Sequence, residues 1–81
     1  MDLEKAEKAS IYASISGVFG SLTNQMSHVD IVQIDTTKLA KKWIDERSQK
    51  YSINLIKEED IIIQFQKLKS GKLKRLARND K

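Results

Sequence analysis

The sequence has no proline among its 81 residues, and its three glycines stand at positions 17, 20 and 71. Proline and glycine most often interrupt helices and mark turns, so their scarcity favours helices joined by short connections. Cysteine is also absent, which excludes disulfides and thiolate sites and fits a reducing compartment. We therefore expect a mostly α, intracellular protein, either cytoplasmic or nuclear.

The length of the chain is close to the lower limit for one core without disulfides or a metal. Self-association would add stability, so a homodimer is the default expectation. The N-terminal "MDLEKAEKAS" carries charges of both signs, unlike a signal peptide. No run approaches the roughly 18 apolar residues of a membrane span, so no transmembrane segment is expected.

The first segment places its apolar residues at helical spacing, which predicts one narrow stripe. The stripe consists of Ile11, Ile15, Val18, Phe19, Leu22 and Met26. Packing within the domain is favoured over a coiled coil, because the pattern covers only two heptads. Gly17 and Gly20 fall inside this helix, where they indicate a kink or a close helix crossing.

Residues 29–34 are rich in β-branched side chains and predict a short strand or an extended link. The favoured fold is a small three-helix domain of the helix-turn-helix type, with this strand as an addition. Two alternatives use the strand directly. One is an α+β ribbon-helix-helix dimer, and the other is a truncated winged helix, since only ten residues follow Gly71.

Two further helices are expected. Residues 36–50 form an amphipathic helix, because five apolar residues share one face: Leu39, Ala40, Trp43, Ile44 and Tyr51. Residues 57–69 form the next helix, with an acidic first turn and a core stripe of Ile61, Phe65 and Leu68. Ile63 falls on the opposite side, as a surface residue, as a partner contact with Ile62 nearby, or as part of a strand "DIIIQF".

Positive charge is concentrated at the C-terminal end. Residues 1–66 hold eight basic and ten acidic groups, net −2, whereas residues 67–81 hold seven and one, net +6. Gly71 either ends the helix with a left-handed cap or lies within a longer helix. In the first case residues 1–70 are the domain and 71–81 a basic tail. In the second case the apolar stripe continues through Leu73 and Leu76.

No residue pattern predicts an enzyme, a metal site or a cofactor. His28 is the one histidine, so a zinc site would lack ligands, and no group is spaced to orient it for catalysis. A phosphate-binding glycine loop is also missing, because "SGK" at 70–72 lacks the rest of that motif. Binding is the remaining class of function.

The leading hypothesis is a small nucleic-acid-binding or regulatory protein, with DNA favoured over RNA. Its phosphate contacts are expected from the C-terminal segment: Lys67, Lys69, Lys72, Lys74, Arg75 and Arg78. Lys69 and Lys72 fall near the apolar side of a continuous helix. A second patch is expected at Lys38, Lys41 and Lys42. Six contacts to duplex DNA would give a log-log salt slope of roughly −5.

The alternative hypothesis is a protein-interaction module that binds an acidic partner as an adaptor, a complex subunit or an inhibitor. Ile63, with Ile62 at its edge, is the expected interface.

Overall fold

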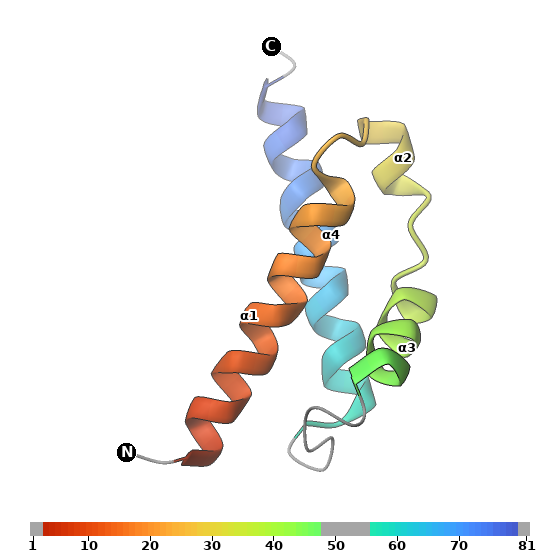
Figure 1. Ribbon diagram of the computed structural model, residues 1–81. Helices are drawn as coiled ribbons and strands as arrows, with labels where there is room; N and C mark the ends of the chain where they lie inside the picture. The colour runs from red at the N-terminus through yellow and green to blue at the C-terminus, as the bar shows by residue number, and fades with distance from the viewer. Residues whose placement is uncertain (1–2, 48–55, 80–81) are drawn as a thin grey trace.

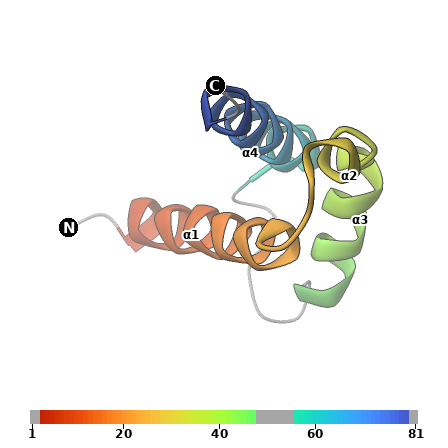
Figure 2. The ribbon, with the colours of Figure 1, turned by 90° about the horizontal axis from the view of Figure 1, so that it is seen from above.

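The computed structural model describes residues 3–47 and 56–79, which form four helices and no strand (Figure 1). The helices are α1 (Leu3–Thr23), α2 (His28–Val32), α3 (Thr36–Arg47) and α4 (Glu58–Asn79). α1 and α4 both run upward in Figure 1 but cross at an angle, which Figure 2 shows from above, and α3 runs downward beside α4 (Figures 1 and 2). The expected mostly helical character is confirmed, with one more helix than expected.

α4 is the central element, because it packs against each of the other three helices. The core lies where α1, α3 and α4 meet. Its buried members are Ile11, Ile15, Phe19, Ala40, Trp43, Ile56, Ile61 and Phe65. The rings of Phe19 and Phe65 are tilted at 54° with centroids 6.4 Å apart, a favourable aromatic geometry that joins α1 to α4.

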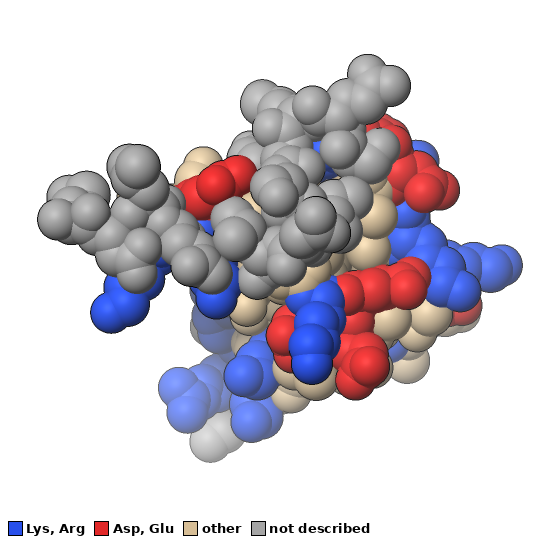
Figure 3. Space-filling view, turned by 90° about the horizontal axis from the view of Figure 1, so that it is seen from below, with Lys and Arg blue, Asp and Glu red and all other residues tan. Residues whose placement is uncertain are grey.

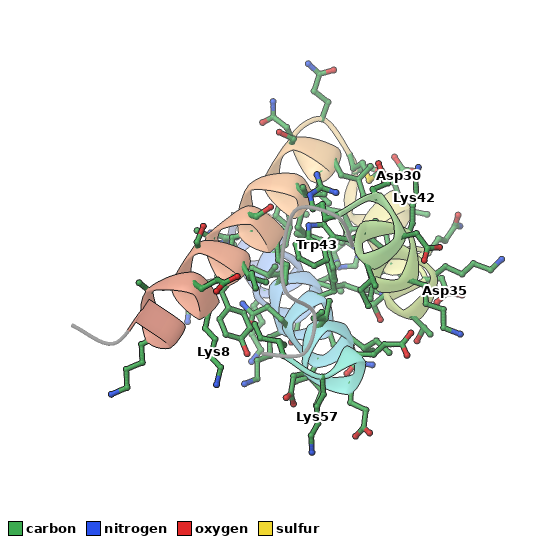
Figure 4. All side chains as sticks on the ribbon, turned by 60° about the horizontal axis from the view of Figure 1, so that its bottom comes forward. Lys8, Asp30, Asp35, Lys42, Trp43 and Lys57 are labelled. Carbon is green, nitrogen blue, oxygen red and sulfur yellow. The ribbon has the colours of Figure 1, made fainter. Side chains whose placement is uncertain are left out.

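α3 contributes Trp43, whose side chain points into the space between the helices (Figure 4) and is 3% exposed. The guanidinium of Arg47 lies 5.4 Å from the centre of its ring, within the range of a cation–π contact. Leu39 and Ile44 are half-buried against the same core. The predicted apolar face of this helix is thus confirmed over 36–47, while residues 48–51 lie outside the described part.

The strand expected at 29–34 is wrong, because residues 28–32 form the short helix α2. Ser27 and Asp30 cap this helix reciprocally. The Ser27 hydroxyl accepts from the Asp30 amide and the Asp30 carboxylate accepts from the Ser27 amide, both at 3.3 Å. Ile31 is fully buried and holds the turn against the body. The ribbon-helix-helix and winged-helix alternatives therefore lose their first strand.

Glycine interrupts neither long helix. α1 continues through Gly17 and Gly20, and a Cβ at either position would meet nothing within 4 Å, so a close helix crossing there is wrong. α4 continues through Gly71, and none of the described glycines has a positive φ, so the left-handed cap is not formed. The interpretation of "DIIIQF" as a strand is also wrong, since those residues lie within α4.

Candidate nucleic-acid interface

The second half of α4 has two chemically distinct sides. Leu68 packs on the core, and Leu73 and Leu76 continue the stripe as half-buried side chains. At 100° per residue, three exposed basic residues lie opposite this stripe and a fourth, Arg75, lies toward its edge on the side of Leu68. These four exposed residues are here called the basic face. The basic face consists of Lys67, Lys74, Arg75 and Arg78.

Along α4, carboxylates do not offset this charge. Residues 61–79 include six basic residues and no aspartate or glutamate, so no basic side chain there has an acidic neighbour at i±3 or i±4. The acidic first turn ends at Asp60, seven residues before Lys67, which is about 10 Å along the helix axis. That separation exceeds the screening length of about 8 Å at physiological salt. The acidic and basic ends of α4 therefore act as separate surfaces.

Lys69 has a structural role. Its Nζ donates to the carbonyl oxygens of Val32 at 2.8 Å and Ile34 at 2.9 Å. Val32 is the last residue of α2 and Ile34 follows it, at a helix end where carbonyl oxygens lack partners within the helix. Lys69 therefore fastens the α2–α3 connection to α4, and its ammonium is occupied by these two bonds.

Lys72 is half-buried on the core side of α4. Together with Lys69 it accounts for the two basic residues that the sequence placed near the apolar side. The structure thus leaves four of the six expected C-terminal contacts on one exposed face.

The second expected patch lies on α3, where Lys38, Lys41 and Lys42 are all exposed. The exposed Asp45 and Glu46 belong to the same outward surface of the helix, and their charge reduces the positive potential there. Acidic and basic side chains are also interleaved on the face of the molecule shown in Figure 3. Of the two basic surfaces in the described residues, the one on α4 therefore has fewer acidic side chains near it than the one on α3.

A groove runs beside the basic face, between α4 and the start of α3. It has a volume of about 530 Å³ and is lined by Thr36, Gln66, Lys69, Ser70, Leu73, Lys74 and Ala77. No carboxylate lines it, and Lys74 belongs to both the groove and the basic face. The sequence analysis missed this groove, although the 4-3-4 spacing of Gln66, Ser70, Leu73 and Ala77 was a signal that they share one side.

The expected partner interface divides in the structure. Ile63 is 44% exposed on α4, whereas Ile62 is half-buried and packs against the core. Leu22 on α1 is similarly exposed, at 41%, and single exposed apolar side chains are common on protein surfaces. Ile62 is thus chiefly a core residue, and Ile63 is the apolar side chain on α4 that a partner could reach.

In the described part of the chain, no three histidine or acidic side chains come together as a metal-binding group. Its helices include none with both the length and the apolar character required to cross a membrane. Comparison with models of protein families, with curated proteins and with solved structures finds no match for this chain.

Proposed function

We propose that the basic face of α4 binds the phosphate backbone of nucleic acid without reading its sequence. The observation that carries this proposal is the set of four exposed cations on one side of a helix that has no acidic residue after its first turn. Binding of this kind is driven by the release of counterions from the nucleic acid. The protein would then act as a regulator by covering a stretch of nucleic acid or by joining two such stretches.

The number of exposed cations sets the expected salt dependence. Lys69 is engaged with α2 and Lys72 is half-buried, so four phosphate contacts are expected instead of six. Four contacts to duplex DNA correspond to a log-log slope of about −3.6.

The proposal does not depend on a helix-turn-helix arrangement. Residues 48–55, between α3 and α4, lie outside the described part of the chain, so the described residues do not include the turn of about three or four residues that defines that motif. Helix-turn-helix docking of α3 and α4 therefore stays a prediction. Acidic side chains at the leading end of a recognition helix would repel phosphates. The acidic first turn of α4 lies at the opposite end of the helix from Arg75 and Arg78.

The test is fluorescence anisotropy with a labelled DNA duplex of about 20 base pairs over a series of salt concentrations. One variant replaces Lys67, Lys74, Arg75 and Arg78 with glutamine. The matched control replaces the exposed Lys38, Lys41, Lys42 and Lys57 with glutamine and so removes the same charge; Lys57 points away from the helices in Figure 4. We expect binding by the wild-type chain and the control, and its loss in the first variant. Equal losses in both variants would show that net charge alone is responsible.

A second function, as a protein-interaction module for an acidic partner, is supported by the exposure of Ile63 on the same helix as the basic face. A partner that covers Ile63 with an apolar side chain could also pair its carboxylates with Lys67 and Lys74. Under this proposal Ile63→Ala abolishes capture of the partner from a cell extract and leaves the circular dichroism unchanged. Leu22→Ala, at a similarly exposed site on α1, is the control. Sedimentation velocity of the same variants tests whether the partner is a second copy.

A further inference from the structure

The surroundings of the basic face bear on which form of nucleic acid it would bind, an inference that rests on the proposed function. Charge alone attracts any polyanion. Three features favour one form of nucleic acid over the others. They are the locations of the aromatic side chains, the spacing of the basic residues along α4 and the residues on the two flanks of the basic face.

The aromatic side chains that the structure describes lie in the core or pack against it, and none belongs to the basic face. Phe19, Trp43 and Phe65 are buried, and Tyr12 is half-buried against them. Tyr51, the fifth aromatic residue, lies outside the described residues. Proteins that bind single strands without sequence preference stack bases on exposed aromatic rings, which supply about 1–3 kcal/mol per base. At the basic face, a single-stranded nucleic acid would find positive charge but no aromatic ring on which its bases could stack.

The basic face is held on a regular helix. Lys67 and Lys74 are seven residues apart, about 10 Å along the axis, and Lys74 and Arg78 are four residues apart, about 6 Å. A duplex also fixes the positions of its phosphates, so the two surfaces meet with little further ordering. A single strand would lose conformational entropy to match the same spacing.

The basic face has a ridge and two flanks. Lys67, Gly71 and Arg78 lie along the ridge, where Gly71 has no side chain and open space beside it. Lys74 lies toward the groove and Arg75 toward the other side, about 100° apart around the axis. α4 therefore has one basic side chain on each side of the line formed by Lys67, Gly71 and Arg78, and this line has no side chain at Gly71.

The groove adds neutral hydrogen-bonding groups to the Lys74 side. Thr36, Gln66 and Ser70 line it together with Lys74 and without any carboxylate. Hydroxyl and amide groups of this kind contact phosphate oxygens in many protein–DNA interfaces. A phosphodiester backbone on this side would thus meet a hollow that is chemically suited to it.

We infer that the basic face binds double-stranded DNA with the second half of α4 along the major groove, so that Lys74 and Arg75 each face one backbone. The long side chains of Lys67 and Arg78, on the ridge between them, extend to phosphates at the edges of the groove. The B-DNA major groove is about 12 Å wide and admits an α-helix. The major groove of A-form RNA is deep and too narrow for side chains to read. The last turns of α4 extend past the end of α1, which leaves this part of the helix accessible (Figure 1).

The test compares three probes with the full chain at about 100 mM salt: a DNA duplex of about 20 base pairs, one of its strands alone, and an RNA duplex of the same sequence. We expect the Kd for the DNA duplex to be about tenfold lower than for the other two. Tighter or equal binding of the single strand or the RNA duplex overturns this inference and leaves the proposed function in place. Binding of none of the probes overturns both.

Two single variants test the arrangement of two flanks. Lys74→Gln and Arg75→Gln should each reduce the magnitude of the salt slope on duplex DNA by about 1, because each removes one phosphate contact. If either variant leaves the slope unchanged, that flank does not contact a backbone and α4 is not seated in the groove.

Discussion

Two lysines two positions apart on α4 show how strongly a residue's role depends on the side of the helix it occupies. Lys67 is exposed on the basic face, whereas Lys69 donates to Val32 and Ile34. The acceptors lie 37 and 35 residues away in the sequence. Local pattern can place Lys69 near the apolar side, but it carries no information on the carbonyls that the fold brings to it.

Replacing Lys69 with methionine should destabilise the protein by about 1–2 kcal/mol. Methionine keeps a long apolar side chain but cannot donate, so two charge-assisted hydrogen bonds are lost, at a site that is only partly buried. Urea unfolding followed by circular dichroism measures the change as a lower midpoint. Lys67→Met on the same helix is the control and should shift the free energy of unfolding by less than about 0.5 kcal/mol. Equal shifts would mean that the Lys69 contacts contribute nothing.

At the scale of the element, helix starts depend on single polar side chains. Asp35 precedes α3, and its Oδ1 accepts from the backbone amides of Thr37 at 3.1 Å and Lys38 at 3.2 Å. Asp35→Ala should therefore cost about 1 kcal/mol in urea unfolding. Asp35→Asn retains an oxygen acceptor at an equally favoured cap residue and should remain near wild type. A loss of the same size in both variants would point to the charge instead of the cap.

For the glycines of α1 we expect a gain in stability on substitution, in contrast to the losses expected above. Gly17 lies within a helix and is exposed, and a Cβ there would meet nothing within 4 Å. Gly17→Ala should raise the free energy of unfolding by up to about 1 kcal/mol, because alanine has the higher helix propensity. The measurement is a thermal unfolding curve, with Gly20→Ala as an independent repeat in the same helix. A lower midpoint in both would reveal a contact that requires glycine.

The helices also show which sequence patterns were sufficient to predict secondary structure. The face of α3 was predictable because Leu39, Ala40, Trp43 and Ile44 repeat at helical spacing. α2 was not, because its β-branched residues suggested a strand, while Ser27, Asp30 and the burial of Ile31 favour one helical turn. The length of α4 stayed open because a glycine inside a helix and a glycine cap look alike in sequence.

At the scale of the whole molecule, α4 serves both the core and the basic face. Phe65 and Lys67 are two residues apart, one fully buried and the other exposed. The cationic surface therefore depends on the packing that holds the opposite side of the helix. The expected four exposed contacts and the groove beside them could not be derived from sequence alone, because both depend on where α2 and α3 pack on α4.

This shared core predicts that the domain unfolds in one step. Trp43 is the protein's one tryptophan and is buried among residues of α1 and α4, so its fluorescence reports α3 packing while circular dichroism reports total helix. The two signals should follow the same urea curve. Phe65→Ala removes a fully buried ring from the contact between α1 and α4. It should lower the free energy of unfolding by about 3–5 kcal/mol and move the midpoints of both curves to the same lower urea concentration. That loss approaches the total stability of a small domain, so this variant should also lose DNA binding. Should tryptophan fluorescence change at lower urea than the helical signal, α3 separates first and the single core is not cooperative.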